Sequence, residues 1–190
     1  MFSEEKVTQM AAYLLLKHGG RMAYLKLMKL LYLSNRRSII ERGRMMGEDA
    51  LFSMKHGPVM SNTLDLIRHK HRKGGKYWYS LLKTDGNDLV FRHDPREVDI
   101  DEVLDRLSRS DLKILDDVYA KFGHMNRFEL RDMTHLKEYC PEWEEAGNSN
   151  RPIDLKSILI YEGKSEEEAN NIIRHMRESE ELMELSSQLR

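Results

Sequence analysis

The run YLKLMKLLYLSNRRSIIERG, residues 24–43, constrains the fold more than any other segment of the chain. Its apolar side chains occupy most of the circumference of a helix instead of one stripe, and Gly43 is a typical stop. A helix of this kind needs other elements around it. We therefore expect a mainly α-helical protein, a compact bundle around a central buried helix at about residues 22–42. One basic stripe of this helix should stay uncovered, formed by Lys26, Lys29, Arg36 and Arg37.

Other elements are indicated by periodicity and by capping residues. Apolar residues at helical spacing predict a helix over residues 3–18. Residues 77–83 and 88–92 alternate instead about the turn pair Asp85-Gly86, which predicts one small β-hairpin at about residues 77–92. Later helices are expected to start at residues that cap or begin helices, namely Asp99, Ser110, Asn126, Pro141 and Ser165.

The C-terminal part of the chain reads as an extension. Residues 146–152, AGNSNRP, have the composition of a linker, so we expect a helical domain over residues 1–163 and a C-terminal helical extension over 164–190. Two apolar stripes of different phase lie on the extension: Ile172, Ile173 and Met176, then Leu182, Met183, Leu185 and Leu189. The second stripe fits a partner protein or a second copy of the chain, and the alternative, folding back on the domain, stays open.

Composition excludes several classes of protein. The 190 residues are 40% hydrophobic and 33% charged with a net charge of -1, which is typical of a globular protein and gives no global field for nucleic acid. The single Cys140 excludes an internal disulfide and fits a reducing compartment. Acidic residues near the N-terminus and the lack of an apolar run of about 20 residues lead us to expect a cytoplasmic protein that does not cross a membrane.

Candidate sites for phosphate, metal and nucleophilic chemistry fail at particular positions. Gly163-Lys164-Ser165 matches the end of a phosphate-binding loop, but Ile158 stands where its first glycine belongs. His69 and His71 lack a third ligand at metal-site spacing, and a nucleophilic Cys140 would need a neighbour that lowers its thiol pKa. We therefore expect no catalytic residue, no metal and no cofactor.

The segment RHKHRKGGKYWY, residues 68–79, is the strongest candidate for a nucleic-acid interface. Its basic groups would contact phosphates and an aromatic ring would stack on a base. The residues that carry this hypothesis are Arg68, Lys70, Arg72, Lys73, Lys76 and Trp78. The alternative, a solvated helix end followed by rings that face the core, is favoured by the near-zero net charge, so nucleic acid is the less favoured partner.

The segment SMKHGPV, residues 53–59, raises the question of whether Lys55 and His56 do chemistry or stand at a corner. Proline fixes φ and suits the first turn of a helix, while the glycine before it accepts a conformation that other residues resist. We interpret Gly57-Pro58 as a corner that feeds a helix. Bonds from Lys55 and His56 to the central helix, or a place on a binding surface, both stay open.

Four short motifs, taken in order over residues 4–162, resemble the Panacea-domain (SocA-like) antitoxin family. They are Lys26-Leu27-Met28-Lys29-Leu30-Leu31-Tyr32, His56-Gly57-Pro58-Val59, Thr134-His135, and Trp143 with Ala146. Two positions depart from the family pattern. Met54 stands where an aromatic residue is usual, and Glu142 stands where proline is usual. We interpret both as packing positions.

The resemblance implies the antitoxin of a bacterial or phage toxin–antitoxin system, which neutralises its cognate toxin by direct protein–protein binding. In one branch of the family it implies a proteolytic adaptor that delivers the toxin to a protease, and it brings no catalytic residue. The competing hypothesis is a nucleic-acid-binding regulator that uses residues 68–79. A homodimer is the further partner hypothesis, and candidate partner-binding residues are Arg36, Arg37 and the two stripes of the extension.

Overall fold

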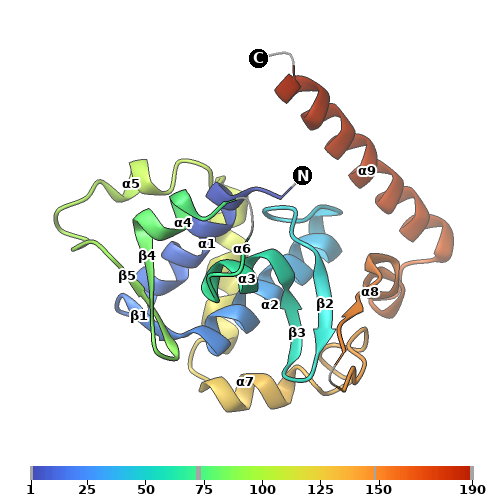
Figure 1. The fold of residues 1–190 in the computed structure, drawn as a ribbon. Helices are drawn as coiled ribbons and strands as arrows, with labels where there is room; N and C mark the ends of the chain where they lie inside the picture. The colour runs from blue at the N-terminus through green and yellow to red at the C-terminus, as the bar shows by residue number, and fades with distance from the viewer. Residues whose placement is uncertain (1, 72–73, 148, 189–190) are drawn as a thin grey trace.

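The computed structural model describes residues 2–71, 74–147 and 149–188, and helices dominate it, which confirms the mainly helical class (Figure 1). The elements in chain order are α1 (Glu4–Lys17), β1 (Arg21–Ala23), α2 (Tyr24–Arg42), β2 (Leu51–Met54), β3 (Gly57–Met60), α3 (Ser61–Ile67), α4 (Lys76–Leu81), β4 (Leu82–Asp85), β5 (Asp88–Phe91), α5 (Ile100–Val103), α6 (Arg109–Phe122), α7 (Arg127–Met133), β6 (Arg151–Pro152), α8 (Leu155–Tyr161) and α9 (Glu166–Gln188).

Helix α2 passes through the middle of the molecule, with α7 below it in the view of Figure 1. It packs against α1, α6, α7, α8 and β3, as the all-round apolar sequence requires. The uncovered basic stripe that we expected on α2 is wrong. Lys26 is 7% exposed, Lys29 is 0% exposed and Arg36 is 9% exposed, because each finds hydrogen-bond partners on distant segments.

The strands form two three-stranded antiparallel sheets, so the expectation of a single hairpin is wrong. One sheet has the order β1-β5-β4, and the other has the order β3-β2-β6. The turn predicted at Asp85-Gly86 does join β4 to β5, one residue further along, at residues 86–87. The remaining strands have two to four residues, too few to show a clear alternating pattern, and β6 pairs with β2 from about a hundred residues away in sequence.

Residues 76–81, expected as the start of the hairpin, form the short helix α4 instead. The reason is a cap supplied by α1: the Glu4 carboxylate accepts hydrogen bonds from the backbone N–H groups of Gly75, Tyr77 and Trp78 at 2.7, 2.9 and 3.0 Å. In this helix Trp78 lies wholly inside the core. A carboxylate 71 residues away therefore overrides the strand preference of alternating aromatic residues.

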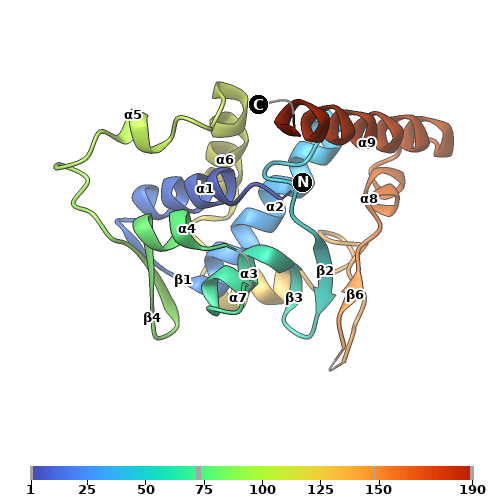
Figure 2. The ribbon, with the colours of Figure 1, turned by 45° about the horizontal axis from the view of Figure 1, so that its top comes forward.

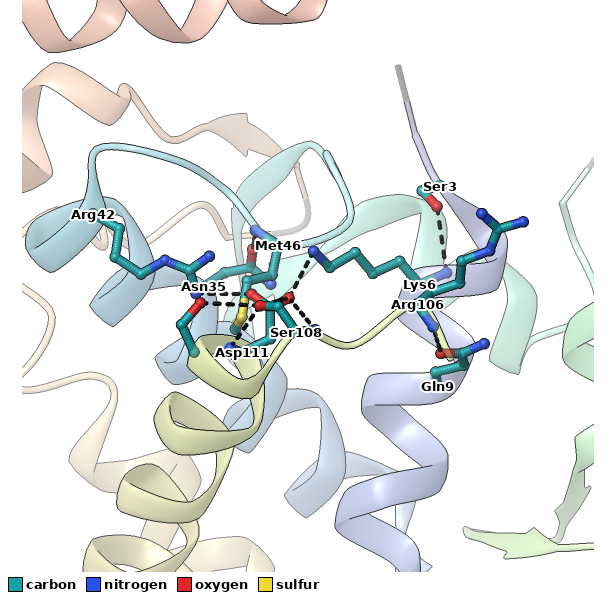
Figure 3. Close-up of polar contacts among 10 residues, drawn as sticks. Ser3, Lys6, Gln9, Asn35, Arg42, Met46, Arg106, Ser108 and Asp111 are labelled. Carbon is teal, nitrogen blue, oxygen red and sulfur yellow. Dashed lines mark hydrogen bonds and ion pairs between the residues drawn. The ribbon is translucent and has the colours of Figure 1, made fainter. Parts of the chain in front are cut away.

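Helix α6 begins two residues earlier in the sequence than expected, because Ser108 and not Ser110 is its N-cap. Ser108 and Asp111 form a capping box. The buried Asp111 carboxylate also pairs with Lys6 at 2.9 Å and with Arg42 at 2.7 Å, which approach it from opposite sides in Figure 3. Burial alone would raise the pKa of Asp111, but these cations and Ser108 outweigh it and lower the pKa. Three helices thus meet at one carboxylate.

The other predicted helix starts divide into two groups. Asp99, Asn126 and Ser165 cap their helices as expected. The helix expected after Pro141 does not form: the backbone over residues 141–147 makes turns and irregular structure. The cause lies in two side chains of this segment, Glu142 and Trp143, which are bonded to α2 and to β2.

Helix α9 leaves α8 and runs along one side of the molecule (Figure 2). Of its first stripe, Met176 is buried, and Ile172 and Ile173 are partly buried against the core. Of its second stripe, Leu182 is 67% exposed and Leu185 is 56% exposed. The side chain of Met183 and the whole of Leu189 lie outside the described residues. The change of phase in the sequence thus corresponds to a change from the core to solvent.

Candidate functional site

The two lysines of the α2 motif donate hydrogen bonds to backbone carbonyls. The Lys26 ammonium bonds to the carbonyl of Gly123 at 2.7 Å, at the end of α6. Lys29 bonds to the carbonyl of Pro58 at 2.8 Å. Burial lowers the pKa of Lys29 from 10.5 to about 7. The cross-corner bond thus starts from the central helix, while Lys55 and His56 are exposed at the turn between β2 and β3.

Gly57 stands where the corner meets the late motif. Its φ is +91°, a conformation that side-chain-bearing residues rarely adopt. A Cβ at this position would lie 2.7 Å from the Lys29 Nζ, 2.8 Å from the Thr134 Oγ1 and 3.1 Å from the His135 Nε2. Three polar atoms from α2 and from the end of α7 therefore surround the glycine, and only a glycine leaves room for them.

His135 and Trp143 pack against each other next to the β2–β3 turn. Their rings stack with centroids 4.2 Å apart, and the Trp143 indole N–H donates to the carbonyl of Met54 at 3.1 Å. Burial and the nearby Lys29 lower the pKa of His135. We call Lys29, Gly57, Thr134, His135 and Trp143 the motif cluster. The structure brings these family-motif residues together, and they hold the β2–β3 hairpin against α2.

Glu142, interpreted from sequence as a packing position, is the centre of a buried ion pair. Its carboxylate accepts a hydrogen bond from the Tyr32 hydroxyl and pairs with Arg36 at 2.9 Å. Arg36 also pairs with Glu162 at 2.8 Å. Burial would lower the pKa of Arg36, but the two carboxylates outweigh it and raise the pKa, while burial and Glu142 raise the pKa of Tyr32. Arg36 therefore lies inside the domain instead of facing a partner.

The remaining motif residues are mostly interior. Leu27, Leu30 and Val59 belong to the hydrophobic core. Burial, with Glu142, raises the pKa of the Cys140 thiol to about 12, which keeps it protonated. Within the described residues there is no group of three or more His, Cys, Asp or Glu side chains placed to hold a metal ion.

Arg37, a candidate partner-binding residue, is half-buried and pairs with Glu41 and Asp117.

The proposed nucleic-acid segment does not assemble as expected. Trp78 is 0% exposed, so its ring faces the core and not a base. Arg68, Lys70 and Lys76 are exposed, and Arg72 and Lys73 lie outside the described residues. The alternative in which the rings face inward holds for Trp78.

A groove of about 480 Å³ opens directly beside the motif cluster. Its walls come from the start of α2, the β2–β3 turn, the end of α3, α7 and the residues Gly147, Ser149 and Asn150. None of its described lining residues is acidic, and Met28, Met54, Val59 and Leu64 are its main apolar lining residues. We call this site the basic groove, after the residues that characterise it: Lys55, Arg68, Arg127, Phe128 and Arg131.

Phe128, Arg127 and Arg131 are residues of the basic groove that were not predicted from the sequence. Phe128 is 49% exposed on α7, and the guanidinium groups of Arg127 and Arg131 lie 4.7 and 5.3 Å from the centre of its ring. A signal was present in RFELR, where two arginines at i and i+4 flank a phenylalanine on a capped helix. The partners that complete the groove come from α2 and β2, which the local sequence does not indicate.

Together these features define a class of protein: a mainly helical domain in which helix α2 is tied through buried polar groups to a Gly-Pro hairpin. The family model described as antitoxin SocA-like, Panacea domain, matches residues 27–144, which is more than half of the chain. The chain belongs to this family. No curated protein and no solved structure shows significant similarity to it. No helix of the described part of the chain combines the length and apolar character needed to cross a membrane.

Proposed function

We propose that this protein is the antitoxin of a toxin–antitoxin pair and that it neutralises the toxin by binding it directly. The observation that carries the proposal is the match of the antitoxin family model over residues 27–144. The family name gives the toxin–antitoxin role, and direct binding is our inference about how the role is performed.

The placement of the motif residues supports binding over catalysis. Lys29, Tyr32 and Cys140 are fully buried and are used in bonds or packing within the domain. Residues that act on a substrate need a cleft in which to meet it. The open surface of the basic groove carries arginine and aromatic side chains, which are enriched where proteins bind proteins.

The experiment is a growth rescue. Each gene beside the coding sequence is expressed under an inducible promoter, and the product that arrests growth is co-expressed with this protein. We expect growth to return and the two purified proteins to elute together from a size-exclusion column. Rescue without complex formation would contradict direct binding.

A protease-deficient host separates direct neutralisation from delivery to a protease. Under direct binding, rescue persists when the main ATP-dependent proteases are deleted and the toxin level stays constant. Under the adaptor alternative, rescue disappears in that host although the complex still forms. A protein that binds the promoter DNA but not the toxin would instead favour the nucleic-acid regulator.

A further inference from the structure

We propose that the basic groove binds an acidic peptide segment with an apolar anchor residue, presented by the toxin. The proposal deepens the proposed function and rests on it for the identity of the partner. The recognition chemistry stands on the groove itself, which combines cationic walls, an apolar floor and one exposed aromatic ring.

The charges of the basic groove lack the compensation found elsewhere on the surface. The ion pairs of the described residues include none for Lys55, Arg68 or Arg127, and Arg131 pairs only with its neighbour Asp132. Several arginines elsewhere on the surface do pair with acids of other segments, as in Arg21–Asp88, Arg37–Asp117, Arg106–Glu5 and Arg151–Glu144. On a chain whose net charge is -1, this is a local excess of positive charge that fits carboxylates of a partner.

The apolar part of the groove explains why the ligand needs an anchor residue. Phe128 is half exposed, and the guanidinium groups of Arg127 and Arg131 both lie within cation–π distance of its ring. Beside it lie Met28 and Met54, whose unbranched side chains adapt to the shape of a ligand. An aromatic ring flanked by arginines is typical of the residues that dominate binding energy in protein interfaces.

The motif cluster makes this groove rigid before any partner arrives. Met54 lines the groove, and its carbonyl is held by the Trp143 indole. Val59 also lines it, next to Pro58, whose carbonyl is held by Lys29. At the opposite wall, the capping box of Asn126 and Glu129 fixes the start of α7. A preformed groove loses less conformational entropy on binding, which raises affinity.

A peptide fits these features better than a nucleic acid does. A nucleic-acid site tracks several phosphates along a basic stripe and stacks bases on exposed rings. The basic groove is short, its floor is apolar, and Trp78, the tryptophan of the basic segment 68–79, is buried. DNA is therefore the competing probe in the test.

The test uses fluorescence anisotropy with a fluorescein-labelled peptide of twelve residues, in which Glu and Asp flank a central Leu-Phe pair. We expect the full-length protein to bind this peptide and to bind a peptide with Lys in place of the acids at least about tenfold more weakly. Phe128→Ser, and separately the double change Arg127→Glu with Arg131→Glu, should each weaken binding of the acidic peptide by about tenfold or more.

The matched control is the double change Arg109→Glu with Lys113→Glu. These two exposed residues have the same i, i+4 spacing, but they lie on α6 outside the groove. The control should keep the peptide affinity within about twofold of the parent, because exposed charges outside the groove contribute little to the stability of the complex. Thermal melts of all variants confirm that they are folded.

The same variants are then tested for rescue against the toxin identified in the growth experiment. Loss of rescue and of complex in the folded groove variants, with both retained in the α6 control, supports the proposal. Full rescue by the groove variants overturns it and leaves the proposed function intact. If no neighbouring gene product arrests growth but the peptide still binds in a groove-dependent way, the proposed function is wrong and the acidic-peptide site remains.

Two results with the probes alone also overturn the proposal. Equal binding of the acidic and the Lys-substituted peptides, or of neither, means that the groove does not select carboxylates. Displacement of the acidic peptide by a short DNA duplex that binds more tightly and in a groove-dependent way assigns the site to nucleic acid.

Discussion

The motif cluster and the basic groove lie side by side and use the same types of side chain in opposite ways. In the cluster, the side-chain nitrogen of Lys29 is buried and donates to a carbonyl of its own chain. In the groove, Lys55 and Arg68 are exposed, and the ion pairs of the described residues include neither. This contrast indicates that the family motif holds the domain together, and we infer that partner choice lies in residues outside the motif.

Removal of the Glu142 carboxylate should have the largest effect on stability. Glu142→Ala leaves the buried Arg36 with one partner fewer and the Tyr32 hydroxyl with none of its described partners, so the free energy of unfolding should fall by about 3–5 kcal/mol. Urea denaturation measures the change. Glu144→Ala is the control, because its pair with Arg151 is exposed and should contribute less than about 1 kcal/mol. Equal effects would break the contrast between interior and surface.

Gly57→Ala should have the next largest effect, and Gly20→Ala is its matched control. Both glycines have similar positive φ values, +91° and +86°, but nothing lies within 4 Å of a Cβ at Gly20. The control should lose about 1–2 kcal/mol from backbone strain alone. Gly57→Ala should lose about 1–3 kcal/mol more, because its methyl group collides with the motif cluster. Equal losses in thermal melts would mean that the crowding around Gly57 is relieved freely.

The protonation of Lys29 should give stability a particular pH dependence. Its pKa is about 7 in the folded chain and 10.5 in the unfolded chain, so between these values the unfolded chain binds the extra proton. The free energy of unfolding should therefore rise with pH above about 7, by up to about 1.4 kcal/mol per unit. Urea denaturation of the parent and of Lys29→Met between pH 6.5 and 8.5 measures it. The variant should lack this slope, and parallel curves would contradict a neutral buried lysine.

Truncation after Ser179 should have the smallest effect. It removes the exposed Leu182 and Leu185, whereas Met176 and the partly buried Ile172 and Ile173 stay in place. We expect the melting temperature to stay within a few degrees, which corresponds to about 1 kcal/mol or less. Analytical ultracentrifugation of both forms tests whether the exposed stripe also holds a homodimer. A large fall in melting temperature would place the end of α9 in the core. The division at residues 163 and 164 stays a prediction.

Much of the helical part was predictable because its determinants are local. The apolar period of α2 and the caps at Asp99, Asn126 and Ser165 lie within a few residues of the elements that they define. The elements that were missed depend on distant partners. Helix α4 is capped by the carboxylate of Glu4, and the two-residue β6 pairs with β2, which lies much earlier in the chain.

The site shows the same limit. Spacing identified the motif residues, but not the direction in which they face, because charged side chains on α2 were expected in solvent. Lys26 and Arg36 are buried because Gly123 and Glu142 meet them from the second half of the chain. The basic groove was missed for a related reason: its arginines and its apolar floor come from separate elements and share no local pattern.

The carboxylate of Glu142 has a consequence for the order of events during translation. Its partners Tyr32 and Arg36 precede it by 110 and 106 residues, and the second partner of Arg36, Glu162, follows it. Until these acids emerge, α2 carries a guanidinium that is costly to bury, so the N-terminal half cannot complete the core by itself. The nascent chain therefore reaches its final packing late. A chain shortened before residue 142 lacks both Glu142 and Glu162, and so leaves the Arg36 guanidinium without either of these two carboxylates.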